Sequence, residues 1–361
     1  MKNVLIFFNS YPTNYRPVLL GISFILLLAC QPQTKSGSTS EEVFVPYQTI
    51  QGQTMGTIGY NITYAGRANY KEEVDSILKE INNEVSTYVP SSSISRFNQS
   101  KDGIEVENIN QRHFLKNISI AKDAAMKTNG SFDPTVMPLV NYWGFGYTGK
   151  EAVTLVDSIK VDSLLQYIGM NKISIGKKRI NKKSAGIQLD FSASAKGYAI
   201  DELGYFLEQK GIFDYKVEIG GEVRTRGKNP NGIFWRLGIN TPKEETSVND
   251  LFAAIQLDNQ SIATSGNYRN YYTVAGVTYS HTINPNTGLP ERTNLLSASI
   301  ITEDCAYADA YATACMVMGL EQAKEWVNTM EDVEAYFIFS GENNELQTYA
   351  TEGIAASIER F

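Results

Sequence analysis

Apolar residues recur three and four positions apart in one stretch of the chain, the spacing that forms a single face of an α-helix. Between residues 70 and 88 this face consists of Val74, Ile77, Leu78, Ile81 and Val85. Helices are also predicted over residues 112–128 and 195–210, because both stretches stop at a glycine or an Asn-Gly pair. Another helix is predicted to begin in the sequence ADAYAT, residues 308–313, and to run to about residue 318.

Short runs rich in β-branched and aromatic residues lie between and after these helices and predict strands. They cover residues 216–219, 235–239, 253–257, 271–274, 277–283, 297–302 and 335–339. Ala275 and Gly276 fit a hairpin turn between two of them. We find no Pro- or Ser-rich linker and no solenoid repeat in residues 43–361. The mixed order of helices and mostly antiparallel strands predicts one compact α+β domain over residues 43–361.

The first 42 residues show a different pattern and are predicted to lie outside this domain. Residues 18–29 form an uncharged apolar run. As a helix this run is about 18 Å long, short of the ~30 Å of a bilayer core, so it predicts a signal peptide over residues 1–29. The junction with Cys30 resembles the lipobox of bacterial lipoproteins, in which the cysteine is lipidated. Residues 30–42 then form the lipidated end and a flexible tether. The alternative is a short core segment with an ordinary cysteine.

The amino-acid composition excludes several classes of protein and several kinds of metal or disulfide site. The 361 residues are 42% hydrophobic and 20% charged, which is typical of a soluble globular protein. Lys and Arg number 32 against 39 Asp and Glu, a net charge of −7, so no basic surplus exists to bind nucleic acid. Three cysteines and two histidines exclude a dense disulfide framework and a His-rich metal site. Any metal here must be held mainly by oxygen.

Two features of the sequence suggest chemistry. Asp309 and Thr313 are four residues apart in a predicted helix, so their oxygens share a face and suit a hard divalent cation such as Mg²⁺. An Asp near a helix start can instead serve as a cap. His281 precedes the sequence TINPNTG and is the side chain best matched to accept a proton near neutral pH. A structural role is the alternative for His281, and it is the one we expect for His113.

Eight segments, taken in order, resemble the ApbE family of flavin transferases. They are TMGT (54–57), STYVPSSSISRFN (86–98), NGSFDPTVMPLVNYWGFG (129–146), DFSASAKGYAID (190–201), IGGEVRTRG (219–227), ATSGNYRNYY (263–272), HTINPNTG (281–288) and ADAYAT (308–313). The resemblance implies Mg²⁺-dependent transfer of FMN from FAD to a threonine hydroxyl of a target protein, through a phosphodiester bond and with release of AMP. It also implies a flavin-accepting electron-transfer protein as partner. With the lipobox, it implies a membrane-anchored lipoprotein of the bacterial cell envelope that faces the periplasm.

The resemblance also implies roles for individual residues. His281 would be the catalytic base, and Asp309 and Thr313 would bind Mg²⁺ together with the backbone carbonyl of Ala193. The residues that would line the FAD site are Met55, Tyr88, Ser131, Phe132, Asp133, Asp190, Lys196 and Ile283. Two other functions stay open: a pyrophosphatase that splits FAD into FMN and AMP, and a non-catalytic FAD-binding lipoprotein. Cys305 and Cys315 are predicted to be free, buried thiols because ten helical residues span about 15 Å, too far for a disulfide.

Overall fold

The computed structural model describes residues 45–107, 111–146, 153, 156–243, 250–266, 271–274, 277–280, 282–291 and 293–361. The predicted signal peptide, Cys30 and the tether lie outside these residues, as does the turn at Ala275 and Gly276. These assignments stay predictions. Among the helices of the described residues, none is both long enough and apolar enough to span a membrane.

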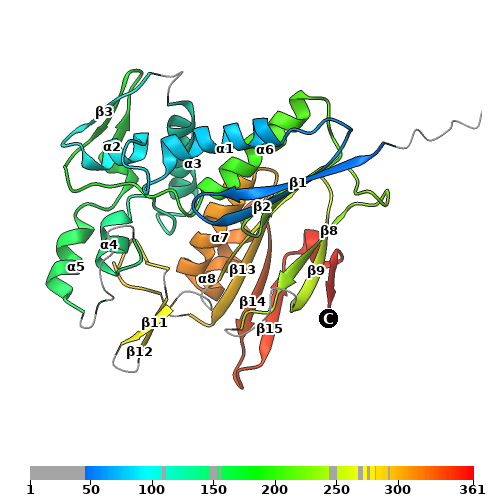
Figure 1. The fold of residues 1–361 in the computed structure, drawn as a ribbon. Coiled ribbons are helices and arrows are strands. Elements are labelled where there is room, and N and C mark those ends of the chain that lie inside the picture. Colours follow the sequence, from blue (N-terminus) through cyan, green and yellow to red (C-terminus); the bar gives the residue numbers. More distant parts are fainter. Residues whose placement is uncertain are drawn as a thin grey trace, which may run out of the picture. The chain divides into compact units, whose positions relative to one another are not determined.

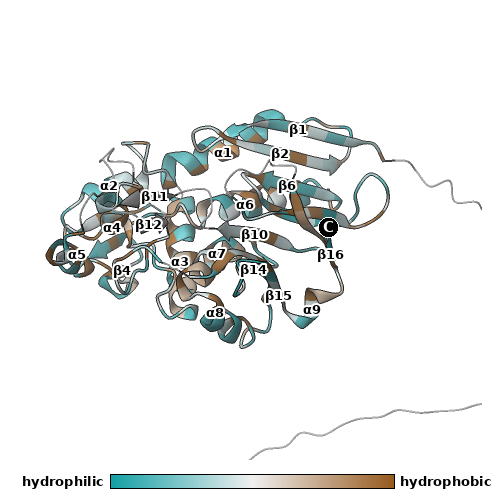
Figure 2. Cartoon of the chain, turned by 90° about the horizontal axis from the view of Figure 1, so that it is seen from below, coloured by the Kyte–Doolittle hydropathy of each residue, from teal (hydrophilic) through white to brown (hydrophobic). Residues whose placement is uncertain are grey.

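A large antiparallel sheet forms the centre of the domain (Figure 1). Within the described residues it has eight strands in the order β1-β2-β6-β7-β10-β13-β14-β15, and Figure 2 shows the labelled strands following this order from one edge to the other. The strands are β1 Tyr47–Thr54, β2 Ile58–Ala65, β6 Tyr215–Ile219, β7 Glu222–Arg226, β10 Ser261–Gly266, β13 Leu295–Thr302, β14 Glu334–Ser340 and β15 Leu346–Ala350. Strands from the beginning and the end of the domain therefore belong to one sheet, with β1 at one edge and β15 at the other.

Three small sheets accompany the large one, with strand orders β16-β9-β8, β3-β5-β4 and β11-β12. Their strands are β3 Gly103–Glu105, β4 Ile173–Ile175, β5 Arg179–Lys182, β8 Trp235–Asn240, β9 Leu251–Leu257, β11 Tyr271–Val274, β12 Val277–Ser280 and β16 Ile358–Arg360. In the antiparallel β11-β12 pair Val274 lies opposite Val277.

The helices lie mainly on one face of the large sheet (Figure 1). They are α1 Lys71–Val85, α2 Ser93–Gln99, α3 Arg112–Lys127, α4 Met137–Tyr142, α5 Ser158–Leu165, the 3₁₀ turn η1 Met170–Lys172, α6 Ala195–Gln209, α7 Cys305–Met318, α8 Leu320–Val327 and α9 Glu352–Ala355. Helices α6 and α7 make the most contacts with the strands. Helix α1 packs against α6 and β1, and α3 packs against α7.

Alternation along the central strands explains how the sheet is buried on both sides. In β14 Ala335 and Phe337 join the core on the helical face, whereas Tyr336 and Ile338 join a second core that includes residues of β8 and β9. Side chains of a strand point alternately to the two faces. A strand buried on both faces therefore needs apolar residues at every position, as 335–338 provide.

Helix α7 is buried almost all round, and its composition explains its position. Five of its fourteen residues are alanine, and the small side chains let β10, β13 and α6 approach closely. At its start the contact with α6 is at backbone level, because a Cβ at Gly197 would lie 2.2 Å from the carbonyl oxygen of Cys305. Asp309 is the one charged residue of this helix.

The fold class predicted from the sequence agrees with this structure, but the ends of some predicted helices and strands differ. The α+β class and the single domain are confirmed. Helix α7 begins at Cys305, earlier than expected, and the strand predicted over 277–283 ends at Ser280. Both predicted free thiols, Cys305 and Cys315, are unpaired and buried.

Candidate active site

A cavity of about 880 Å³ opens between α4, the start of α6, the end of β10 and α7. Ligand sites in proteins commonly measure about 300–1,000 Å³, so this cavity is large enough for a dinucleotide. Its wall combines polar groups from α6, β7 and α7 with apolar groups from α4 and the loop before it. Ten of the residues assigned by resemblance line it: Tyr88, Ser131, Phe132, Asp133, Asp190, Ala193, Lys196, Ile283, Asp309 and Thr313.

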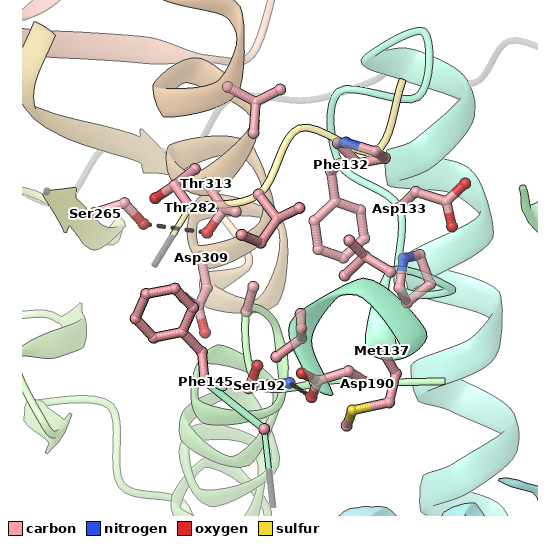
Figure 3. A pocket seen from close by; sticks show the side chains of 18 of the residues that line it. Phe132, Asp133, Met137, Phe145, Asp190, Ser192, Ser265, Thr282, Asp309 and Thr313 are labelled. Atoms are coloured by element: carbon pink, nitrogen blue, oxygen red, sulfur yellow. Dashed lines mark hydrogen bonds between the residues drawn. The ribbon is translucent and has the colours of Figure 1, made fainter. Parts of the chain in front are cut away.

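Helix α7 presents Asp309 and Thr313 to the cavity from successive turns (Figure 3). The Thr313 hydroxyl lies 3.1 Å from the Ser265 hydroxyl at the end of β10. Asp309 does not cap the helix. That role belongs to Asp201 of α6, whose carboxylate accepts hydrogen bonds of 2.9 Å from the backbone N–H groups of Cys305 and Ala306. Asp309 is therefore not a cap of its own helix. Its Oδ2 accepts a 3.3 Å hydrogen bond from the Gly197 N–H in the first turn of α6, at the cavity wall.

Lys196 lies in the first turn of α6, beside the Asp309 carboxylate. Its Nζ is 3.5 Å from Asp309 Oδ2 and 3.3 Å from Glu222 Oε1. Burial of the ammonium lowers the pKa of Lys196, but attraction by Asp309 and Glu222 outweighs this effect and raises the pKa above its usual value. The ammonium is thus held in its charged form inside the cavity, where it can bind an anionic group.

Glu222 was not predicted as a site residue, yet its carboxylate lines the cavity and is buried. Gly220 and Gly221, both with positive φ, form the two-residue turn between β6 and β7 that places Glu222 at the start of β7. Burial raises the pKa of Glu222, and the Lys196 ammonium opposes that shift. The Gly220-Gly221 pair was visible in the sequence, but the contact between Glu222 and Lys196 was not.

The loop before α6 forms the floor of the cavity. Asp190 Oδ1 accepts a hydrogen bond of 2.8 Å from the backbone N–H of Ser192, which turns the chain toward the helix (Figure 3). The Asp190 N–H donates to the carbonyl of Pro134 at 2.7 Å, joining this loop to the one before α4. Burial raises the pKa of Asp190. Ala193 follows in the same loop and lines the cavity.

Asp133 lies on the opposite side of the cavity from Asp309, and its carboxylate is engaged in the loop (Figure 3). Oδ1 accepts from the N–H and the hydroxyl of Thr135, at 2.8 and 2.6 Å, and Oδ2 accepts from the N–H of Met170 at 3.2 Å. Burial raises the pKa of this carboxyl, and these hydrogen bonds counteract the shift. Asp133 thus fixes the shape of the loop that carries Ser131 and Phe132.

Apolar side chains form the wall that faces the charged cluster. Phe132, Met137 and Val140 contribute to it, whereas Phe145 lies beside Asp309 (Figure 3) and Val317 follows Thr313 one turn later on α7. Tyr88 lies at the rim with 76% of its surface exposed. Such a wall suits the face of an aromatic ring system, whereas the opposite wall suits charge.

Two assigned residues are not placed at the cavity. Met55 lies in the β1–β2 turn with φ of 47°, packs against the main core and is not among the lining residues. His281 lies outside the described residues, although Thr282, Ile283 and Pro285 after it line the cavity. The buried His113 places Nδ1 2.8 Å from the Tyr198 hydroxyl, in keeping with a structural role.

The oxygen groups at Asp309 fit a hard divalent cation. Among the described residues, its contacts with Lys196 and with the N–H of Gly197 both use Oδ2. The Thr313 hydroxyl follows one turn later. The described residues contain no cluster of three or more His, Cys, Asp or Glu side chains that would hold a metal alone. A cation here would therefore also need carbonyl, water or ligand oxygens, which is the usual way in which Mg²⁺ is bound.

Comparison with known proteins identifies the family. The sequence profile of the ApbE family matches residues 55–337. The chain belongs to the ApbE family. The FAD:protein FMN transferase of Vibrio cholerae is 35% identical over 312 residues, 83% of this chain and 86% of that protein. The FAD:protein FMN transferase of Escherichia coli is 31% identical over 334 residues, 90% of this chain and 92% of that protein.

Solved structures of ApbE proteins share the fold. The flavin transferase ApbE from Vibrio cholerae superposes with a TM-score of 0.75 at 32% identity, covering 85% of this chain and 98% of that one. The resemblance drawn from the eight sequence segments is confirmed. The chain is an enzyme of the ApbE family, and its described cavity is the candidate active site.

Proposed function

We propose that this ApbE protein transfers FMN from FAD to a threonine hydroxyl of a target protein, with Mg²⁺ as cofactor and AMP as the leaving product. One observation carries the proposal: a single cavity large enough for a dinucleotide sets Lys196, Asp309 and Thr313 opposite an apolar wall. The names of the curated relatives, FAD:protein FMN transferase, support flavin transfer.

The residues of the charged wall would act by binding and orienting the diphosphate. The Lys196 ammonium provides positive charge for its oxygens. Asp309, Thr313 and the Ala193 carbonyl would hold Mg²⁺, which when bound neutralises charge on phosphate oxygens and on the leaving group. The apolar wall would take a ring of FAD and exclude water from it. Positioning and charge stabilisation supply most of the catalysis in phosphoryl transfer.

The reaction requires a base for the incoming hydroxyl, and we assign this role to His281. The threonine oxygen attacks the FMN-side phosphorus, and the bond from this phosphorus to the bridging oxygen breaks. AMP leaves with the bridging oxygen, and the threonine proton passes to the imidazole. A neutral histidine is matched to this task because its usual pKa is near 6.5.

The test is incubation of the protein with FAD and MgCl₂, with and without a threonine-bearing flavin acceptor. Intact mass of the acceptor reports covalently added FMN, and chromatography reports AMP. AMP release that needs the acceptor supports transfer. AMP release with water alone indicates the pyrophosphatase, and FAD binding with no AMP under any condition indicates a carrier. His281→Ala is expected to retain FAD and to lose about 10²- to 10⁴-fold in rate.

We also propose that Cys30 is lipidated and anchors the protein to a membrane of the bacterial cell envelope, facing the periplasm. The apolar run before Cys30 and the polar tether after it support this assignment. The full chain is expected to fractionate with membranes, and Cys30→Ser to release it or to leave it uncleaved. Equal membrane retention of a processed Cys30→Ser variant would contradict the anchor.

A further inference from the structure

The Lys196 ammonium is shared among three acceptors at the cavity wall. Nζ lies 3.3 Å from Glu222 Oε1, 3.5 Å from Asp309 Oδ2 and 3.5 Å from the Ser192 carbonyl oxygen. Charge-assisted N–H···O bonds are usually about 2.7–2.9 Å long, so none of the three is at its preferred length. An ammonium held in this way can move toward either carboxylate without first breaking a strong bond.

Of the two carboxylates beside Lys196, those of Asp309 and Glu222, the one of Glu222 has no role yet in the site. Glu222 is 6% exposed, and its Oε2 is buried without a hydrogen-bond partner among the described residues. A buried carboxylate with one weak ion pair is costly. The turn residue Gly220 lies against both side chains, because a Cβ there would be 3.6 Å from Glu222 Oε2 and 3.6 Å from Lys196 Cδ, and 2.8 Å from Ile58 Cγ2. The carboxylate that Lys196 already contacts through Oε1 therefore has a second, unused acceptor, Oε2.

The Asp309 carboxylate is the group for which two cations would compete. Its described contacts are with the Lys196 ammonium and the Gly197 N–H. A divalent cation bound to the same carboxylate repels the ammonium, because both are positive and lie in a buried environment. The lysine must then find its counter-charge elsewhere in the cavity wall.

We propose that Glu222 is a positioning residue that keeps the Lys196 ammonium in the cavity when a divalent cation engages Asp309. The inference rests on the proposed function, because it requires that cation. With Glu222 present, Lys196 gives up Asp309 and stays beside the diphosphate site. With Glu222 neutralised, Asp309 is the remaining carboxylate partner of Lys196 in this cluster, and the ammonium competes more strongly with the cation.

The experiment measures FAD binding by fluorescence quenching as MgCl₂ is increased, using the full protein. The variants are Glu222→Gln, Lys196→Met and the double variant. Glu218→Gln is the matched control, since Glu218 of β6 forms a 2.8 Å ion pair with Lys216 of the same strand and does not line the cavity. AMP measured in the same samples shows that FAD is intact. Thermal unfolding shows that each variant is folded.

Glu222→Gln is expected to raise the half-saturating MgCl₂ concentration about tenfold, the lower end of the effect of groups that orient metal ligands. In the Lys196→Met background the same change is expected to have less than about a threefold effect, because its target is gone. Glu218→Gln should leave the value unchanged. Equal effects of Glu222→Gln in both backgrounds, or none in either, overturn the inference.

These outcomes separate the inference from the proposed function. Wild-type protein that binds FAD with MgCl₂, alongside a Glu222→Gln variant with the same MgCl₂ dependence, overturns the positioning role and leaves the transferase proposal intact. Wild-type protein that binds no FAD at any MgCl₂ concentration overturns both. A thermal midpoint that falls in Glu222→Gln, with unchanged MgCl₂ dependence, assigns Glu222 a structural role only.

Discussion

Replacing Gly197 by alanine tests the backbone contact that sets α6 against α7. The added Cβ would lie 2.2 Å from the Cys305 carbonyl oxygen, 2.5 Å from its carbon and 2.7 Å from the nitrogen of Ala306. Real Cβ atoms do not approach closer than 3.0 Å, so the helices must separate by at least about 0.8 Å at this point. The obstacle is backbone, which cannot rotate away as a side chain would.

The energetic and catalytic effects follow from that separation. Overpacking of a core costs about 1–3 kcal/mol, and alanine recovers about 1 kcal/mol of helix propensity over glycine. We therefore expect the free energy of unfolding to fall by up to about 2 kcal/mol. The rate of FMN transfer should also fall, because the Gly197 N–H donates a hydrogen bond to Asp309 and moves with α6. A misplacement of a site group by about 1 Å costs roughly 10²-fold in rate.

Urea unfolding and the rate of FMN transfer measure the two effects on one preparation. Gly59→Ala is the matched control, since a Cβ at Gly59 meets no atom within 4 Å. It should behave like the wild type in both assays. A Gly197→Ala variant with wild-type stability and wild-type transfer would refute the reasoning, because the two helices could not then be in backbone contact.

Three further changes test other parts of the domain. Burial, and next Arg112, lower the pKa of His113 from 6.5 to about 4, so the unfolded chain binds more protons between these values. The free energy of unfolding should be intact above pH 6.5 and fall by about 3 kcal/mol toward pH 4, and urea titrations of His113→Gln should show a flatter pH dependence. Asp201→Ala removes the 2.7 Å partner of Arg224 and the cap of α7, but Asp304 stays 3.2 Å from Arg224, so the cost in urea unfolding should be about 3 kcal/mol, the lower end for a broken buried pair. A loss below about 1 kcal/mol would contradict the buried pair. Asp309→Asn should abolish the MgCl₂ dependence of FAD binding, and a wild-type response to MgCl₂ and EDTA would exclude Asp309 as a metal ligand.

The sequence by itself determined local structure and family. The spacing of Val74, Leu78, Ile81 and Val85 specified α1, because a helix repeats every 3.6 residues and one face must be buried. Gly211 and the Asn129-Gly130 pair likewise marked helix ends. The eight segments indicated the ApbE family because all of them occur in the family's order along one chain, which chance does not produce. These features can be recognised in the sequence because they depend only on residues that are close together along the chain.

Only the tertiary structure decided how distant groups share one site. Asp133 lines the cavity as the resemblance implies, but only the folded chain shows that its Oδ2 accepts from the backbone N–H of Met170. Glu222 gave no signal of its own, yet β6 pairing with β2 and β7 brings it to Lys196. Such contacts join residues separated by tens of positions, and their distances depend on sheet order and helix packing. No local periodicity encodes that order, so the partners of a buried charge become visible only once the chain is folded.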